Sequence, residues 1–460
     1  MPNAYSNWNN GQTVTIKHSN YIKKKHNLAN NLNQQQNYME PIIERFLRYI
    51  AIDTQSDENS TTQPSTTKQF DLQRILLCEL TEMGITATLD QYGYLMASIP
   101  ANTEGDITPI GFIAHVDTSP DCSGKNINPQ IITNYTGGDI ILNKERNIVL
   151  SEKMFPELRN YLNQTLITTD GTTLLGADDK AGVAAIMHAA NHIMKHPEIK
   201  HGQIKIAFTP DEEVGRGVEH FDVAKFGARY AYTIDGGEIG ELEYENFNAA
   251  TATLLIHGTN IHPGYAKNKM INAARIAMEI DSMLPKYERP ESTDGYDGFY
   301  HLTGMTATVE EASMHYIIRD HDHDKFLLRK NNLTSIAESI NDKYGPSTVE
   351  ITITDSYYNM RKMVEPHIHI VEKAIQAMKD CNVTPLVRPI RGGTDGASLS
   401  FKGIPCPNIF AGGHNFHGRY EYLPVQSMMK AADVIVRIIT LFAQGDKYQP
   451  IDIQQTNTHI

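Results

Sequence analysis

The stretch QIKIAFTPDEEVG, residues 203–215, places three consecutive carboxylates directly after an apolar, strand-like run. Like charges this close repel one another, and beside a core such a cluster calls for a compensating positive charge. The order of strand followed by acid recurs in RYAYTIDGGEIG, residues 229–240, and IGFIAHVD, residues 110–117, combines it with a histidine. Between them, DKAGVAAIMHAANHIMK, residues 179–195, has a helical apolar period. Strands alternating with helices predict an α/β sheet with helices on both faces.

Length and pattern also predict how the chain is divided. A chain of 460 residues is too long for one compact core, so we expect two domains. Residues 1–38, rich in Asn, Gln and Lys, are typical of a disordered extension, and Met39 is a candidate initiator. Residues 39–246 and 358–450 are predicted to form one discontinuous catalytic domain. Residues 247–357 combine strand-like AATATLLIHG and MHYIIRD with two amphipathic helical patterns, which predicts an inserted α+β lid domain.

Composition excludes several classes of partner and place. The net charge of −13 argues against nucleic acid or an anionic membrane as a partner, since both select for basic surfaces. Four cysteines stand far apart with no CxxC spacing, which argues against a disulfide framework or a thiolate zinc site. No window approaches the roughly 20 apolar residues of a membrane helix, and the N-terminus lacks the apolar core of a signal peptide. We therefore expect a cytoplasmic protein.

Polar side chains with metal-binding chemistry follow the apolar strands. His115, Glu212 and Asp235 each stand at or just past a strand end, and ligands of α/β sheets gather beyond the carboxyl ends of the strands. Asp117 leaves the same face of its strand as His115, and a carboxylate is the usual second partner of a metal-binding imidazole.

Each candidate also has an ordinary explanation when taken alone. Asp178 and Asp179 in LLGADDKAG stand where a turn enters a helix, and one of them can serve as an N-cap. Asp235 before Gly is a common turn residue. The acids of DEEVG suit a solvated turn, His115 suits a surface position beside a turn, and the two histidines of GGHNFHG suit a loop.

Taken together, the same residues indicate one kind of site. Histidines and carboxylates recur beyond successive strands, without CxxC pairs or a phosphate-binding loop, and mixed ligands of this kind suit zinc or a neighbouring divalent ion. Two such cations would supply the positive charge that the acidic cluster needs. The sequence therefore predicts a two-metal hydrolase.

Longer motifs carry a resemblance to a known family. HVDTSPDCSGKN, LLGADDKAG, FTPDEEVG, TIDGGEIGELEYENFNA, YYNMR, PIRGGTDGASLSF and HNFHG resemble the di-zinc metallopeptidase family that contains tripeptide aminopeptidases, aminoacylases and glutamate-releasing carboxypeptidases. The resemblance runs from about Met39 to about residue 445. It implies a di-zinc exopeptidase-type catalytic domain with a mixed, mostly parallel sheet, and an inserted α+β lid or dimerisation domain.

The resemblance also implies a ligand set and a mechanism. Asp178 would bridge two Zn²⁺ ions per subunit, with Co²⁺ or Mn²⁺ as substitutes. Glu212 would act as general base on a water held between the metals, and Asp117 would orient a ligand. Asp179 would shape the turn, and His414 would be an extra imidazole beside the site. The implied ligands are His115, Asp178, Glu213, Asp235 and His417.

The substrate implied by the resemblance is a tripeptide. His262 in NIHPG resembles a lid histidine that contacts the substrate, sometimes from the partner subunit, although alone it suits a strand-end position before proline. Arg361 in YYNMR and Arg319 in YIIRD are candidates for gripping a carboxylate bidentately, and Arg319 suits a surface ion pair equally well. Gly393 and Thr394 are further candidates, because they belong to the RGGTDG loop, whose glycines permit close backbone approach to substrate. A homodimer through the lid domain is a further expectation.

Three functions remain to be compared. The first is an aminopeptidase that removes the N-terminal residue of tripeptides. The second is another amide hydrolase of the same fold and metal class, such as a dipeptidase, deacylase or carboxypeptidase, because the metal site engages only the amide. The third is a non-catalytic metal- or peptide-binding protein, which would have no need of a proton shuttle such as Glu212.

Overall fold

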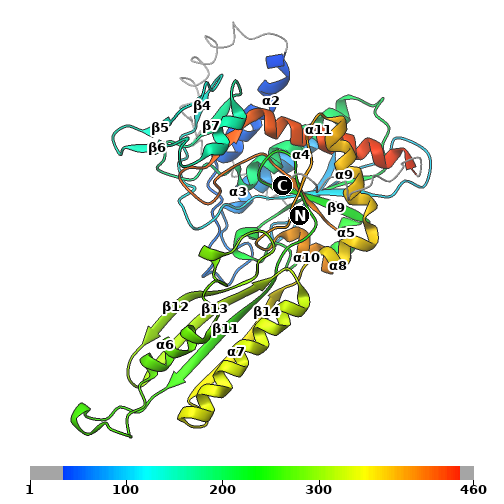
Figure 1. Ribbon diagram of the computed structural model, residues 1–460. Coiled ribbons are helices and arrows are strands. Elements are labelled where there is room, and N and C mark those ends of the chain that lie inside the picture. The colour runs from blue at the N-terminus through cyan, green and yellow to red at the C-terminus, as the bar shows by residue number, and fades with distance from the viewer. Residues whose placement is uncertain (1–34, 446–460) are drawn as a thin grey trace, which may run out of the picture.

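The computed structural model describes residues 35–445. The expected disordered extension lies outside the described residues except for its last four positions. These open helix α2 (Gln35–Ile50), which begins four residues before Met39. The described chain forms two parts that Figure 1 shows as a body and a projecting lobe.

An eight-stranded mixed sheet organises the body, which confirms the α/β sheet that the sequence predicts and the mixed sheet that the resemblance implies. Strands β8, β3, β9 and β16 run parallel at its centre, so their carboxyl ends meet along one edge. In spatial order the strands are β1 (Thr86–Leu89), β2 (Leu95–Ile99), β8 (Ile204–Thr209), β3 (Ile110–His115), β9 (Tyr230–Gly236), β16 (Asn408–Phe410), β10 (Glu241–Glu243) and β15 (Leu386–Val387).

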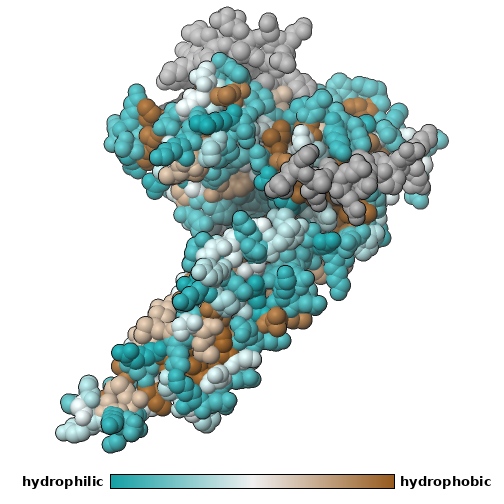
Figure 2. Space-filling model, viewed as in Figure 1, coloured by the Kyte–Doolittle hydropathy of each residue, from teal (hydrophilic) through white to brown (hydrophobic). Residues whose placement is uncertain are grey.

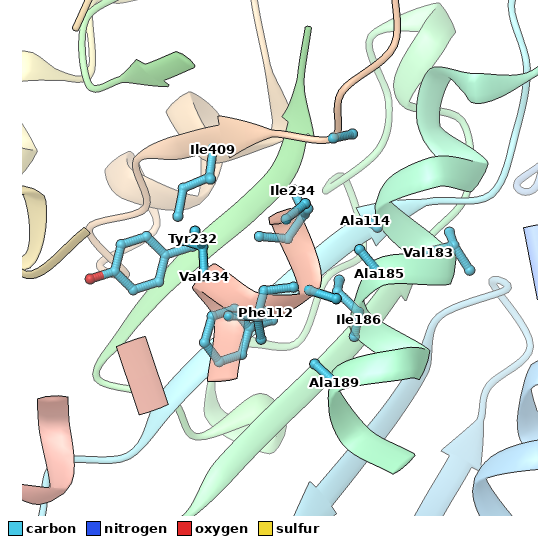
Figure 3. Packing of buried hydrophobic residues seen from close by; sticks show 14 of the residues in the cluster. Phe112, Ala114, Val183, Ala185, Ile186, Ala189, Tyr232, Ile234, Ile409 and Val434 are labelled. Atoms are coloured by element: carbon cyan, nitrogen blue, oxygen red, sulfur yellow. The ribbon is translucent and has the colours of Figure 1, made fainter. Parts of the chain in front are cut away.

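Helices cover both faces of this sheet because its central strands are apolar on both sides. On β3, Phe112 and Ala114 face one core while Ile113 faces the other. Figure 3 shows the first core, where helix α4 packs its small and branched side chains against β3 and β9. The helices of that face are α2, α3 (Gln69–Glu82), α4 (Ala177–Lys195), α9 (His369–Asp380) and α11 (Val425–Ala443). On the opposite face lie α5 (Val223–Phe226) and α10 (Asp395–Phe401).

The close approach of α4 to β9 depends on Gly182. A Cβ at this position would overlap the carbonyl oxygen of Ile234 and the carboxylate of Asp179. We expect Gly182→Ala to lower the free energy of unfolding by about 1–3 kcal/mol, because overpacking forces backbone shifts. Urea unfolding measures this loss. Gly304→Ala is the matched control, since a Cβ there meets its first atom only at 3.9 Å, and an equal loss in both variants would contradict the packing argument.

The projecting lobe is built on a separate antiparallel sheet. Its strands, in spatial order, are β12 (Phe299–Ala307), β13 (Glu311–Asp320), β11 (Asn248–His257) and β14 (Val349–Tyr357). Helices α6 (Ala273–Met283) and α7 (His323–Tyr344) pack on one face and share a core of their own. Both strands and both helices expected between 249 and 340 are present. The β11–α6 connection lies at the end of the lobe away from the body.

Two small sheets have no counterpart in the sequence analysis. Strands β17 (Tyr422–Pro424), β7 (Leu166–Thr168) and β4 (Gln130–Ile132) form one of them, and β5 (Ile140–Asn143) and β6 (Ile148–Leu150) form the other. The short helix α8 (Arg361–Val364) follows the lobe. Hydrophilic residues cover most of the face seen in Figure 2. Within residues 35–445, no helix is both long and apolar enough to cross a membrane.

Candidate metal centre

The parallel strands and one helix bring the predicted ligands to the same edge of the sheet. His115 ends β3 and pairs in register with Thr209 at the end of β8. Directly after β8, the 3₁₀ turn Glu212–Val214 carries Glu212 and Glu213. Asp235 lies near the end of β9, and Asp178 lies in the first turn of α4. His417 reaches the same place from the loop between β16 and β17.

Asp178 stands between two imidazoles. Its Oδ1 lies 3.0 Å from His115 Nε2, and its Oδ2 lies 3.3 Å from His417 Nε2. His115 Nε2 is also 3.3 Å from Asp235 Oδ1, and His417 Nε2 is 2.9 Å from Glu213 Oε2. The cluster therefore has two halves, each with one imidazole and one further carboxylate, that share Asp178.

Asp117 organises three of its neighbours at once. Its Oδ1 lies 3.4 Å from His115 Nδ1 and accepts a hydrogen bond from the backbone N–H of Glu212, while Oδ2 accepts one from the backbone N–H of Glu213. The side chain is fully buried, so these contacts are shielded from water. On the other imidazole, Asp121 Oδ2 lies 3.3 Å from His417 Nδ1.

Two neighbouring aspartates point elsewhere. Asp179 Oδ2 accepts a hydrogen bond from the backbone N–H of His115, and Oδ1 accepts one from that of Gly182. Although its oxygens are near enough to His115 and Asp235 to form a metal-sized group, both already serve backbone donors. Asp211 accepts hydrogen bonds from the backbone and hydroxyl of Ser65 and from Gln69, so the first acid of DEEVG ties α3 to the sheet.

Burial and mutual repulsion shift the pKa values of the clustered acids. Burial, with repulsion from Asp178, raises the pKa of Glu213 to about 8, and burial raises the pKa of Asp235 to about 6. The pKa of Glu212 is raised well above its usual value, again mainly by burial. Burial opposes ionisation of Asp178 too, but hydrogen bonds from His115 and His417 hold its pKa below the usual value.

The donor set fits divalent metal ions. Each half offers one imidazole and one carboxylate besides the shared Asp178, and mixed N/O sets of this kind suit zinc and its neighbours. His115, Asp178 and Glu213 have ligand atoms within 4.8 Å of one another. Glu213 Oε1 is buried without a hydrogen-bond partner, and coordination of a cation would satisfy this oxygen. The His417 side chain is 43% exposed and that of His115 2%, so solvent reaches the cluster at His417.

His414, the other histidine of HNFHG, belongs to the neighbouring core. Its Nε2 lies 2.6 Å from the hydroxyl of Tyr161, and its ring stacks on Tyr422 with centroids 4.8 Å apart. Burial lowers its pKa to about 4. The ring is thus a packing element of the small β17–β7–β4 sheet, and its partners lie outside the ligand cluster.

His262, one of the expected substrate-binding residues, lies far from the ligand cluster. His262 precedes the 3₁₀ turn Pro263–Tyr265 in the β11–α6 connection and accepts a hydrogen bond from the backbone N–H of Gly264. Since β11 has ten residues and a strand rises about 3.3 Å per residue, roughly 30 Å of strand separates His262 from the base of the lobe.

The two arginines already have protein partners. Arg361 donates to Glu245 and lies 3.5 Å from Glu365, on the wall of a cavity of about 890 Å³ at the junction of lobe and body. Arg319 donates to the carbonyl oxygen of Arg391. In the same loop, Gly393 packs against the ring of Tyr357 and Thr394 caps α10.

Two buried acids beside the cluster were missed by the sequence analysis. Asp395 accepts a hydrogen bond from the hydroxyl of Thr209, and burial raises its pKa to about 7. Glu421 accepts three backbone N–H groups around Asp178. No sequence signal marked either acid: Asp395 lies in a motif interpreted for its glycines, and Glu421 follows the last ligand motif.

Comparison with known proteins identifies relatives of this chain. The model of peptidase family M20/M25/M40 matches residues 170–441. Peptidase T of Listeria innocua is 56% identical over 408 residues, covering 88% of this chain and all of its own. Peptidase T of Geobacillus thermodenitrificans is 58% identical over 406 residues, covering 88% of this chain and 99% of its own.

Solved structures share the fold. An aminopeptidase from Bacillus cereus superposes with a TM-score of 0.69 at 22% identity, over 88% of this chain and 99% of its own. A dinuclear metal-binding peptidase of family M20 from Bacillus subtilis superposes with a TM-score of 0.62 at 14% identity, over 89% of this chain and 99% of its own. The family model matches more than half of this chain, and the two Peptidase T relatives are more than 50% identical to it along nearly their whole length. This chain therefore belongs to peptidase family M20/M25/M40.

Proposed function

We propose that this chain is a metallo-aminopeptidase that hydrolyses the N-terminal residue from tripeptides. The observation that carries the proposal is the ligand cluster shared through Asp178, with Glu212 adjacent to it and outside the ligand contacts. The preference for tripeptides is supported by 55–58% identity to curated Peptidase T relatives over nearly their whole length.

The residues proposed to hold two zinc ions follow the two halves of the cluster. Asp178 would be shared, His115 and Asp235 would complete one site, and Glu213 and His417 the other. Zinc, or Co²⁺ or Mn²⁺ in its place, would supply Lewis acidity that polarises a carbonyl and lowers the pKa of bound water. The buried acids repel one another. Two divalent cations would also supply the positive charge that compensates this repulsion.

Glu212 is proposed as the group that moves the proton. A general base is most effective when its pKa lies near the working pH, and burial raises the pKa of Glu212 above its usual value. Asp117 holds the backbone N–H groups of both Glu212 and Glu213. It therefore fixes the proton-transfer side chain relative to the adjacent ligand, and Glu212 can carry a proton from water to the departing amine.

Substrate binding is proposed to involve the lobe. His262, on the far end of the lobe, would reach the cluster of a second subunit in a homodimer formed through the lobe. Arg319 and Arg361 would bind the peptide carboxylate, and Gly393 and Thr394 would line its path. Arg361 would have to release Glu245 to do so. The four unpaired cysteines support the cytoplasm as the place of action.

A small set of peptides separates this activity from other amide hydrolysis. We expect Ala-Ala-Ala to release free alanine with a kcat/KM at least about 10-fold above that of Ala-Ala, with little release from N-acetyl-Ala-Ala-Ala. One missing interaction of about 1.4 kcal/mol corresponds to such a factor, and acetylation removes the free amine altogether. Products are measured by chromatography. A preference for the acetylated peptide would show a deacylase or carboxypeptidase instead.

A further inference from the structure

A buried carboxylate outside the predicted ligand set supports the centre of the cluster. Glu421 is 1% exposed. Its Oε2 accepts hydrogen bonds from the backbone N–H groups of Leu175 at 2.6 Å and Gly176 at 2.9 Å, and its Oε1 accepts one from that of Asp178 at 3.1 Å. Three backbone donors of one turn therefore converge on a single side chain.

Glu421 supports the turn that leads into helix α4. In this turn Gly176 has a left-handed backbone, and Asp178 and Asp179 have non-helical backbone angles, so their N–H groups need partners outside a helix. The regular helix that follows is capped by Asp179, whose Oδ1 accepts a hydrogen bond from the backbone N–H of Gly182. Glu421 instead serves the turn before this cap, from a distant part of the chain.

The same carboxylate also joins two segments that carry ligands. Glu421 follows His417 by four residues in a loop that is closed by backbone hydrogen bonds between His414 and Tyr422. Its three donors lie in the turn that presents Asp178. A shift of one segment against the other would change the 3.3 Å separation between His417 Nε2 and Asp178 Oδ2.

We propose that Glu421 is a positioning residue of the metal centre: it holds the His417 loop and the Asp178 turn in register, so that both reach the same ion. Ligand-orienting partners of this kind typically contribute 10–100-fold to metal affinity. The inference rests on the proposed two-metal centre but not on the identity of the substrate.

Replacing the carboxylate by an amide tests the contact. In Glu421→Gln, the carbonyl oxygen can serve one side of the turn, while the amide N–H₂ faces a backbone donor on the other. We expect about 10–100-fold weaker binding of one Zn²⁺ per subunit. The second ion would share Asp178 but not the His417 loop, so it should lose less affinity than the first. Elemental analysis after dialysis and competition with a chromophoric zinc chelator measure both quantities.

A matched variant separates positioning from general destabilisation. Asp320 in the lobe is also 1% exposed and accepts hydrogen bonds from the backbone of Asp322 and from Arg329. Asp320→Asn makes the same change of acid to amide away from the ligands. It is expected to lower thermal stability while both zinc ions bind as in the wild type.

The outcomes are distinct. Wild-type zinc affinity in a folded Glu421→Gln variant would overturn the inference, and so would equal weakening in Asp320→Asn. If Glu421→Gln fails to fold by circular dichroism, Glu421→Asp decides: it keeps the charge but is one methylene shorter, and it should fold with weakened binding of one ion. Failure of both variants to fold would show a purely structural role. Because metal binding is measured directly, a wrong substrate assignment would leave these results intact.

Discussion

Glu212→Gln is expected to lower kcat by about 10²–10⁴-fold, the range that general acid–base catalysis contributes, with unchanged metal content. The backbone N–H of Glu212 is held by Asp117 and its side chain makes none of the imidazole contacts of the cluster. An amide can fill the same space but cannot accept and return a proton. Steady-state hydrolysis of Ala-Ala-Ala, with elemental analysis of the same sample, measures both parts of the prediction.

The control for this variant is a nearby surface glutamate. Glu219 is exposed and its side chain has no role in the proposed chemistry, so Glu219→Gln should keep wild-type kcat and KM. Activity close to wild type in Glu212→Gln would remove the assigned role of the residue. Loss of activity together with loss of metal would instead place Glu212 among the groups that hold the ions.

Removal of bound metal should abolish peptide hydrolysis. A Lewis acid contributes several kcal/mol of charge stabilisation, and each 1.36 kcal/mol is a factor of ten, so we expect at least about a 10³-fold loss. Dialysis against 1,10-phenanthroline prepares the metal-free protein. Titration with Zn²⁺ or Co²⁺ should then restore activity, with a break at about two equivalents per subunit if both halves of the cluster are filled.

Two controls make the metal experiment specific. Chelator already saturated with zinc should leave the enzyme active, which excludes a direct effect of the compound. The non-chelating isomer 1,7-phenanthroline should have no effect at the same concentration. Undiminished hydrolysis by protein that contains no stoichiometric transition metal would contradict the two-metal proposal and the physical explanation of the acidic cluster.

Removal of metal is also expected to lower the thermal stability of the folded protein. Without cations, burial and repulsion from Asp178 raise the pKa of Glu213 to about 8, so this acid holds a proton at neutral pH instead of binding a cation. A ligand that binds only the folded state stabilises it by mass action. Thermal unfolding should therefore occur at higher temperature as zinc is added, which gives a readout independent of turnover.

The sequence predicts where the candidate site lies better than it distinguishes the ligands from the residues next to them. Acids in turns and histidines in loops are common, and they indicate a site here because they recur after successive strands. Asp178 and Asp179 stayed equivalent on the residues alone, and the resemblance was needed to favour Asp178. The structure supplies the physical difference, since both oxygens of Asp179 accept backbone hydrogen bonds. His414 and His417 differ similarly, because His414 stacks on Tyr422.

Glu421 and Asp395 show where sequence patterns carry no information. The donors of Glu421 lie about 245 positions earlier in the chain, and Thr209, the donor to Asp395, lies 186 positions earlier. A local pattern records which side chains an element exposes or buries. It does not record which backbone groups a distant loop will meet after folding.

The amino-acid sequence by itself determined the alternation of strands and helices and the edge of the sheet at which acids and histidines lie. It also determined that these residues form a mixed set of imidazole and carboxylate ligands. These follow from side-chain periodicity and ligand type, which are local properties. Only the tertiary structure decided which carboxylate stands between the two imidazoles, which acids serve the backbone instead, and how far His262 lies from the cluster. Those outcomes depend on the packing of α4 against β3 and β9 and on contacts between segments remote in sequence, because burial and hydrogen-bond partners exist only once the chain has folded.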